Sequence, residues 1–200
     1  MLKNHQSNQE KETINMIVIN LFGVPGAGKS TCAAYVFAKL KMKGVNAELI
    51  TEFAKDKVWE NNIEVFKNQP YIFGKQSYRM SRCRDKVDVI VTDSPLPLTL
   101  LYNHDTTLGS EFDQVVMNVF NSYQNMNFLL KRDFPYSKIG RHENEEQSKK
   151  LESPLKILLS IHKISYFEMD SNSNTYDRIV NLVLWRCQEL KRGEKNEAKL

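Results

Sequence analysis

A chain of 200 residues is long enough to bury one sizeable core and short for two. Hydrophobic residues make up 41% of the sequence and aromatic residues 10%, which excludes a largely disordered chain, and a net charge of +4 is too small to indicate nucleic-acid binding by itself. The three cysteines, Cys32, Cys83 and Cys187, lie far apart in the sequence, which disfavours a zinc site or a disulfide framework.

The apolar runs are short. None approaches the ~20 residues that a membrane-spanning helix needs, and the N-terminus lacks the apolar core of a signal peptide. Cysteines without evident partners are typical of a reducing compartment. We therefore expect a cytoplasmic protein that has no membrane partner.

Strands and helices are predicted to alternate through one domain, residues 16–191, between a flexible tail at 1–15 and a charged tail at 192–200. Apolar runs followed by turn signals predict strands at 16–22, 46–51, 87–93, 125–131 and 164–170. The intervening segments predict helices at 29–43, 57–66, 69–85, 109–123, 144–160 and 175–191. This alternation predicts a three-layer α/β/α fold with a mostly parallel sheet, whose ligands bind beyond the carboxyl ends of the strands.

The first predicted strand leads into GVPGAGKS, residues 23–30, which matches the P-loop pattern G-x-x-x-x-G-K-[ST]. The predicted strand before it and helix after it are the context that this motif requires. Such a loop turns backbone N–H groups inward around phosphates, and the helix N-terminus adds positive partial charge. We expect Lys29 to reach the β- and γ-phosphates of ATP and Ser30 to ligate Mg²⁺. The expected nucleotide-binding residues are Gly23, Pro25, Gly26, Ala27, Gly28, Lys29, Ser30 and Thr31.

Glu52 follows the second predicted strand, in LITEFAKD. A carboxylate at the carboxyl end of a strand can orient an acceptor hydroxyl or take its proton. Gln76 and Arg79 share a face of the next long helix, where a glutamine can hydrogen-bond a base and an arginine can pair with a phosphate. We therefore expect Glu52, Gln76 and Arg79 to bind the substrate, and a solvated basic face is the competing interpretation of this helix.

Asp93 ends the third predicted strand, VDVIVTD, where a P-loop enzyme places a carboxylate for Mg²⁺. Asp88 lies at the opposite end of the same strand and is expected to be a surface residue. The segment 93–109 that follows contains two of the prolines and is either a loop that covers the substrate or a simple connection. Asp93 is thus the second expected metal ligand, and either Asp93 or Glu52 can serve as the base.

Residues 131–143, after the fourth predicted strand, carry basic side chains around a Pro-Tyr and a glycine bend. Arginines on such a lid can close over the phosphates and stabilise charge on the transferring group. We expect Arg132 and Arg141 to act in this way, against the alternative of an ordinary basic surface loop.

Three other P-loop classes lack their signatures in this sequence. A small GTPase needs the guanine-reading N-K-x-D tetrapeptide and an ABC-type ATPase needs an LSGGQ-like segment, and neither occurs. A ring-forming motor needs a longer module with a separate lid domain. A compact kinase remains.

INLFGVPGAGKST, LITEFAKD, YIFGKQSYRMSR and VDVIVTDSPL together resemble a family of small P-loop ATPases and kinases common in bacteriophage genomes. That family is similar to the ribosylnicotinamide kinase domain and, more distantly, to nucleoside and nucleotide kinases. The resemblance implies a P-loop NTPase fold with a parallel five-stranded core, Mg-ATP as phosphoryl donor and, for a phage protein, the host cytoplasm. It also implies that Glu52 and Asp93 match acidic residues after strands two and three, and that Arg132 and Arg141 are lid arginines.

The sequence departs from nucleoside monophosphate kinases after the third strand. Those enzymes often have Asp-Arg or Glu-Arg there, whereas this chain has Asp93, Ser94 and Pro95. The difference favours a nucleoside hydroxyl over a monophosphate as acceptor. Related kinases are often dimers, so the resemblance leaves a homodimer open.

Three functions follow from these features. The first is Mg-ATP-dependent phosphoryl transfer to a small nucleoside- or nucleotide-like acceptor. The second is the same transfer to a hydroxyl on DNA or RNA, at a modified base or a strand end, suggested by the basic residues of the predicted lid and of residues 79–84. The third is a regulatory ATPase that has no acceptor and uses its nucleotide state to move the lid.

Overall fold

A computed structural model describes residues 16–139 and 141–197, so the expected tail at 1–15 lies outside the described residues. Its centre is a five-stranded sheet in the order β2-β3-β1-β4-β5, and all four strand pairs are parallel. The strands are β1 (Ile17–Phe22), β2 (Ala47–Ile50), β3 (Val89–Thr92), β4 (Gln124–Lys131) and β5 (Phe167–Asp170). The predicted five strands and parallel sheet are confirmed.

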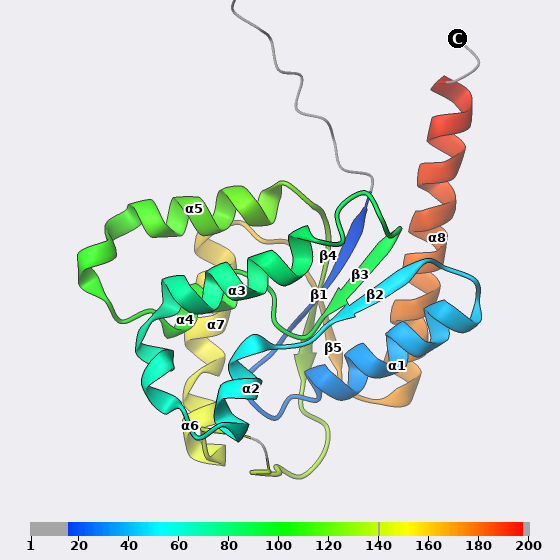
Figure 1. The fold of residues 1–200 in the computed structure, drawn as a ribbon. Helices are drawn as coiled ribbons and strands as arrows, with labels where there is room; N and C mark the ends of the chain where they lie inside the picture. The colour runs from blue at the N-terminus through cyan, green and yellow to red at the C-terminus, as the bar shows by residue number, and fades with distance from the viewer. Residues whose placement is uncertain (1–15, 140, 198–200) are drawn as a thin grey trace, which may run out of the picture.

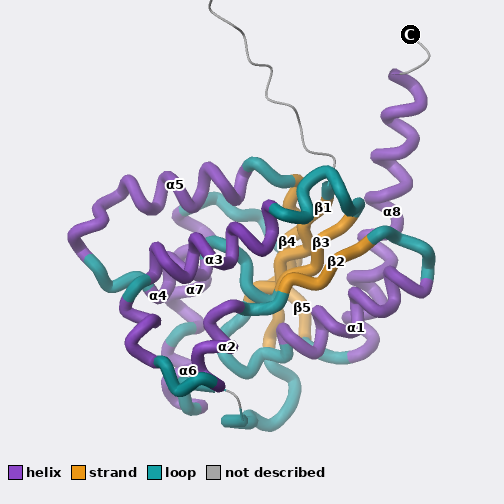
Figure 2. The backbone as a smooth tube through the Cα atoms, in the orientation of Figure 1, coloured by secondary structure: helices purple, strands orange, loops and turns teal. Residues whose placement is uncertain are grey.

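Helices cover both faces of the sheet (Figures 1 and 2). On one face lie α1 (Lys29–Met42) and α8 (Ser173–Glu197), which share an apolar cluster with β1 and β4. On the other face lie α3 (Gln69–Ser81), α5 (Gly109–Asn121) and α7 (Glu152–Ile161). The shorter helices are α2 (Phe53–Trp59), α4 (Leu98–Tyr102), α6 (Glu145–Lys150) and two 3-10 helices, Ile63–Lys67 and Thr106–Leu108. The molecule therefore has the expected α/β/α layers.

The sequence of the central strand β1 is almost continuously apolar because helices cover both of its faces. Ile17, Ile19 and Leu21 face the α1 and α8 side, and Val18 and Phe22 pack into the clusters of the opposite face. Every residue of β1 is buried. A strand covered by helices on both faces loses the apolar-polar alternation of a half-exposed strand.

The strand order places the end of β1 at the point where the chain changes direction across the sheet. From β1 the chain crosses to β2 and returns to β3, and from β3 it crosses β1 to reach β4 on the other side. Ligands of open parallel sheets bind in the crevice that forms beside such a switch point, outside the carboxyl ends of the strands. The P-loop after β1 and Asp93 after β3 therefore meet there.

The predicted helix at 57–66 is wrong. The structure has α2 from Phe53 to Trp59 and a separate 3-10 helix from Ile63 to Lys67. Asn61 between them has a φ of 56°, in the left-handed region that interrupts a right-handed helix. Helix α2 also begins four residues earlier than the start predicted at residue 57, because the side chain of Gln76 accepts the hydrogen bond of the Phe53 backbone N–H.

The predicted helix at 144–160 is two helices, α6 and α7, that meet at Leu151. Pro154 lies in the first turn of α7, where its missing N–H costs little, whereas in a continuous helix its ring would clash with the preceding turn. Two other boundaries differ: α8 continues to Glu197, beyond the predicted end at 191, and α4 forms within the segment 93–109.

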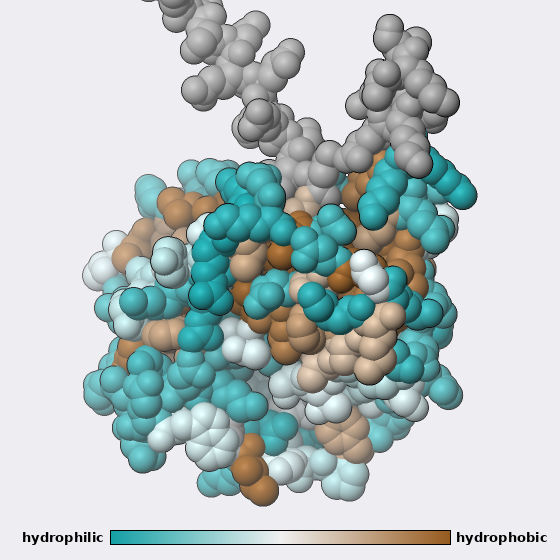
Figure 3. Space-filling view, turned by 45° about the vertical axis from the view of Figure 1, so that its right-hand side comes forward, coloured by the Kyte–Doolittle hydropathy of each residue, from teal (hydrophilic) through white to brown (hydrophobic). Residues whose placement is uncertain are grey.

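Exposed large apolar side chains are spread over several elements. Hydrophilic residues predominate on the face turned to the viewer in Figure 3, and exposed apolar residues lie mainly in its upper half. The exposed ones include Met42 on α1, Trp59 on α2, Tyr78 on α3 and Trp185 on α8. Among the helices of the described residues, none combines the length and apolar character of a membrane span.

Candidate active site

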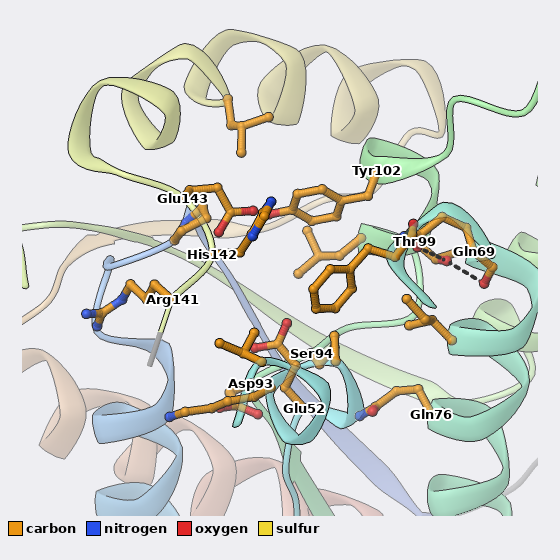
Figure 4. A pocket seen from close by; sticks show the side chains of 18 of the residues that line it. Glu52, Gln69, Gln76, Asp93, Ser94, Thr99, Tyr102, Arg141, His142 and Glu143 are labelled. Atoms are coloured by element: carbon orange, nitrogen blue, oxygen red, sulfur yellow. Dashed lines mark hydrogen bonds between the residues drawn. The ribbon is translucent and has the colours of Figure 1, made fainter. Parts of the chain in front are cut away.

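A cavity of about 840 Å³ opens beyond the carboxyl ends of the strands. At one end it is lined by the P-loop residues Pro25, Gly26, Gly28, Lys29 and Ser30. At the other end the walls come from α2, the 3-10 helix at Ile63–Lys67, α3, α4 and the segment before α4. Their apolar residues are Ala54, Val58, Ile63, Phe66, Ile72, Phe73, Leu96 and Leu98, and polar or charged residues such as Lys55, Glu64, Lys67, Gln69 and Thr99 lie among them. Figure 4 shows Glu52 and Asp93 side by side within this cavity. Two chemically different ends thus flank a pair of carboxylates.

The P-loop needs glycine at two positions. Gly26 and Gly28 have φ angles of 81° and 85°, which side-chain-bearing residues rarely adopt. Space is also lacking, because a Cβ on Gly26 would lie 2.7 Å from the Tyr136 ring and one on Gly28 would overlap the Ser171 hydroxyl. Gly28 is the N-cap of α1 and has no side chain to accept from the first N–H groups of that helix. These N–H groups are therefore available to donate hydrogen bonds to an anion.

Lys29 begins α1 and is held by its own loop. Its Nζ donates to the backbone oxygens of Gly23 at 2.8 Å and Val24 at 3.2 Å. Burial lowers the pKa of the Lys29 ammonium, and the carboxylates of Glu52 and Asp93 oppose that shift. The result is a partly desolvated cation at the phosphate end of the cavity.

The remaining P-loop residues differ in what they offer the cavity. Ser30 lines it from the first turn of α1, whereas Thr31 is exposed and lies outside the lining of the cavity. Ala27 is buried in the core, and its N–H donates to the Val24 oxygen at 3.0 Å within the loop. Ser148 on α6 fixes the loop from outside by donating to the Pro25 oxygen at 2.6 Å.

Asp93 lies one residue beyond β3 and is only 5% exposed. Its Oδ1 is buried and has no hydrogen-bond partner among the described residues. Burial raises the pKa of the Asp93 carboxyl, while the Lys29 ammonium and the backbone N–H of Glu52 act in the opposite direction. Buried polar atoms usually have a hydrogen-bond partner, so a buried carboxylate oxygen without one is suited to bind a hard cation such as Mg²⁺.

The donor set fits Mg²⁺ bound together with phosphates. The described residues contain no group of three or more His, Cys, Asp or Glu side chains suited to a metal. Mg²⁺ prefers oxygen ligands and is usually bound by one or two protein carboxylates with substrate phosphates and water. The Ser30 hydroxyl and the Asp93 carboxylate supply oxygens of this kind at the phosphate end.

Glu52 is the N-cap residue of α2, yet its side chain makes no capping hydrogen bond. The carboxylate lines the cavity instead. Burial raises the pKa of Glu52 to about 7, against the Lys29 ammonium, and the carboxylates of Asp93 and Glu143 add to the rise. A carboxylate with a pKa near neutrality is suited to accept a proton.

Gln76 and Arg79, both predicted to bind the substrate, contact the segment around Glu52. The Gln76 side chain is 3% exposed and accepts a hydrogen bond from the Phe53 N–H. Arg79 donates to the Thr51 oxygen at 3.1 Å and pairs with Asp56 at 2.5 Å. Of the two, Gln76 lines the cavity and Arg79 lies outside its lining among the described residues.

The two predicted lid arginines stack on one tyrosine ring. The guanidinium carbons of Arg132 and Arg141 lie 5.1 and 5.5 Å from the Tyr136 ring centroid. Arg132 pairs with Glu145 at 2.8 Å and does not line the cavity in the described part of the chain. Arg141 donates to the Ser137 oxygen and does line the cavity (Figure 4). Only one of the two arginines is thus brought to the phosphate end.

Sequence reasoning missed several cavity residues. Figure 4 shows Tyr102 of α4 and Glu143, the last residue of the predicted lid, approaching each other across the top of the cavity. Burial raises the pKa of the Tyr102 hydroxyl above its usual range, so this group stays neutral. Gln69 and Thr99 join α3 to α4 through a 2.9 Å hydrogen bond. Glu143 resembled an ordinary charged residue before a helix, and no sequence pattern distinguished it.

Helix α6, which follows the lid, begins with a capping box. The Asn144 side chain accepts from the Gln147 N–H at 2.9 Å, and the Gln147 side chain accepts from the Asn144 N–H at 2.8 Å. We expect Asn144→Ala to lower the free energy of unfolding by about 1 kcal/mol, and the Tm by roughly 2–4 °C. Thermal unfolding measures it. Glu146→Ala on the same helix is the control, with an expected change within about 0.5 kcal/mol, and equal shifts for both variants would contradict a role for the cap.

Comparison with known proteins gives a family and a fold. A family model described as an AAA domain matches residues 18–177. The structure of deoxyadenosine kinase from M. mycoides with bound dATP has a TM-score of 0.54 at 20% sequence identity, covering 84% of this chain and 98% of the kinase. The dCTP-bound structure of the same kinase gives 0.51 at 18%, covering 86% and 99%. At such identities the likeness establishes the fold. No curated protein matches the sequence.

Proposed function

The chain belongs to this AAA domain family, and from that premise we propose that it is a Mg-ATP-dependent kinase that phosphorylates a hydroxyl of a nucleoside-like acceptor. The observation that carries the proposal is the two-ended cavity. A P-loop lies at one end, two carboxylates follow it, and a compartment with apolar and polar walls continues beyond them. An ATPase without an acceptor has no need of that compartment.

The phosphate end would hold Mg-ATP. The open N–H groups at the start of α1 and the Lys29 ammonium face the phosphates, and Ser30 and Asp93 would ligate Mg²⁺. Mg²⁺ held by Ser30 and Asp93 would supply positive charge that offsets the negative charge of the phosphates. Arg141 lines the same region and adds positive charge where the transferring group passes.

The acceptor end would hold a flat, mostly apolar molecule that carries hydroxyl groups. Ile72, Phe73 and Leu98 provide apolar surface for a base, and the Tyr102 hydroxyl and Glu143 carboxylate provide polar groups for a sugar. A nucleoside combines these two characters. The M. mycoides kinase of the same fold is a deoxyadenosine kinase, which places deoxynucleosides among the candidates to be tested.

Glu52 is assigned as the base and Asp93 as the metal ligand. With a pKa of about 7, the Glu52 carboxylate can take the proton of the acceptor hydroxyl. The hydroxyl oxygen forms its bond to the γ-phosphorus as the bond from that phosphorus to the β–γ bridging oxygen breaks, which leaves ADP and the phosphorylated acceptor. Asp93 accepts hydrogen bonds from backbone N–H groups, and its Oδ1 has no partner among the described residues, which suits a fixed ligand.

The test is transfer of label from γ-labelled ATP, with Mg²⁺, to a panel of acceptors. The panel holds nucleosides, deoxynucleosides, their monophosphates, nicotinamide riboside and short DNA with normal and hydroxymethylated bases. We expect label on a nucleoside-like acceptor. Label that appears only as free phosphate, whatever the acceptor, would contradict the proposal and point to a regulatory ATPase.

Two of the basic residues that suggested the nucleic-acid alternative make contacts within the protein. Arg79 pairs with Asp56, and Arg84 stacks on Tyr123 and donates to Ser122. These side chains are engaged within the protein. Label on the oligonucleotides of the panel, with binding that weakens steeply as salt rises, would establish this alternative instead.

A further inference from the structure

We propose that Gln76 is a positioning residue that fixes Glu52 and Asp93 relative to each other, in place of the substrate-binding role that the sequence predicts for it. The inference rests on the proposed function, since it concerns the two carboxylates assigned there. It deepens that function by naming what holds the base in place. The evidence is the set of partners of the Gln76 amide group.

One partner is the start of α2. Gln76 Oε1 accepts from the Phe53 N–H at 3.0 Å, and Phe53 is the first residue of the helix. The first N–H groups of a helix have no partner within the helix, and the N-cap side chain usually provides one. Here the N-cap is Glu52, whose carboxylate makes no capping bond. Gln76 therefore satisfies the first N–H of α2 from α3, and the Glu52 carboxylate remains in the cavity.

The other partners lie at the ends of two strands. Gln76 Nε2 makes longer contacts with the Thr51 oxygen, at 3.4 Å, and with Thr92 Oγ1, at 3.5 Å. Thr51 directly follows β2, and Thr92 is the last residue of β3 and is fully buried. Thr92 Oγ1 also accepts from the Ser94 N–H at 3.1 Å, across Asp93. One amide group thus joins the segments that carry both carboxylates.

The hydrogen bond from the Phe53 N–H keeps the Gln76 carbonyl turned toward the start of α2. Its orientation is fixed, because only Oε1 can accept from the Phe53 N–H. Turning the carbonyl to a ligand would leave that N–H unpaired in a buried residue, which is costly. Figure 4 shows the side chain reaching from α3 toward Glu52.

Arg79, one turn further along α3, provides a matched control. It also donates to the Thr51 oxygen, at 3.1 Å, and its guanidinium lies 5.2 Å from the Phe53 ring centroid. Unlike Gln76 it is partly exposed and contacts neither the Phe53 N–H nor Thr92 in the described structure. Its loss should loosen the outer side of α2 and leave the link between the two strand ends intact.

The kinetic test compares Gln76→Met with Arg79→Met on each acceptor that the wild type phosphorylates. A displacement of about 1 Å can cost on the order of 10²-fold in rate. We expect Gln76→Met to lower kcat by roughly 10- to 100-fold and by a similar factor for every acceptor, with the acceptor KM changed less than about threefold. Arg79→Met should change kcat by less than about threefold. A raised KM with a changed ranking of bases would overturn the proposal.

One further readout does not depend on turnover. In Gln76→Met, hydrogen exchange at the Phe53 amide should speed up, because this N–H loses its acceptor. An unchanged amide exchange rate would contradict the link between Gln76 and the start of α2. If the wild type phosphorylates nothing in the panel, the proposed function fails while this measurement still decides whether Gln76 holds the start of α2.

Gln76→Glu guards against the case in which Gln76→Met does not fold. It keeps an oxygen for the Phe53 N–H and the size of the side chain, and the Thr92 hydroxyl can turn to donate to it, whereas the contact with the Thr51 carbonyl oxygen is lost. We expect it to keep the Phe53 amide protected and the acceptor ranking of the wild type. A reversed ranking of bases in this variant would show that residue 76 reads the acceptor.

Discussion

Replacing Lys29 with methionine is expected to abolish phosphoryl transfer and leave the fold intact. Phosphoryl transfer depends on positioning and charge stabilisation, and Lys29 supplies the positive charge at the phosphate end of the cavity. We expect kcat/KM to fall by at least ~10³-fold, which is about 4 kcal/mol of lost transition-state stabilisation. Methionine keeps the length of the aliphatic part of the side chain, with sulfur in place of one methylene group, and lacks the ammonium.

The fold should tolerate this change, because burial disfavours the charged form of Lys29 and the lost bonds are to two carbonyls of its own loop. We expect the Tm to stay within a few degrees of the wild type. Mg-ATP should raise the Tm of the wild type and do so less for the variant. Lys41→Met makes the same chemical change on the exposed side of α1 and should leave kcat/KM unaltered. Normal turnover by a folded Lys29→Met protein would refute the proposed function.

Replacing Glu52 with glutamine is expected to remove the base. General base catalysis typically contributes about 10²- to 10⁴-fold, so kcat/KM at pH 8 should fall by that factor. In the wild type, kcat/KM should rise with pH and level off above about 7, because the carboxylate must be deprotonated to accept the proton. The variant should lose this rise. Glu60→Gln, at the other end of α2, is the control and should keep the wild-type pH dependence. If kcat/KM of Glu52→Gln still rises with pH as in the wild type, the base is another residue.

The same substitution should stabilise the protein above neutral pH. Folding raises the pKa of Glu52 from 4.5 to about 7, so between these values the folded protein holds a proton that the unfolded chain has released. The free energy of unfolding therefore falls as pH rises through this window, by on the order of 3 kcal/mol once the pH exceeds about 7. Below pH 4.5 both states are protonated and the effect vanishes.

Glu52→Gln cannot ionise, so at pH 8 it should unfold at a higher temperature than the wild type, and the two should converge toward pH 5. Each kcal/mol corresponds to roughly 2–4 °C in Tm for a chain of this size. Thermal unfolding at several pH values measures the difference. A variant less stable than the wild type at pH 8 would show that contacts of the Glu52 carboxylate outweigh the cost of burying it.

Local signals made part of the fold predictable. The central strands β1 and β3 are buried on both faces, so each is a short, mainly apolar run that can be found without tertiary context. Boundaries were less predictable where a distant residue decides them. Helix α2 starts at Phe53 because Gln76, more than twenty positions away, accepts its N–H, and nothing in the local sequence shows this.

The site divides in the same way. The sequence by itself determined the P-loop, since Gly26, Gly28 and Lys29 act through a contiguous backbone turn and the start of one helix. It also located Glu52 and Asp93, because the carboxyl ends of parallel strands meet at one edge of the sheet.

Only the tertiary structure decided which side chains reach the cavity between these elements. It brought Tyr102 and Glu143 to the acceptor end, placed Arg141 but not Arg132 among the lining residues of the described chain, and tied Gln76 and Arg79 to the segment around Glu52. Helical spacing tells which residues share a face, whereas their partners depend on which backbone and side-chain groups other elements leave unpaired when the chain packs.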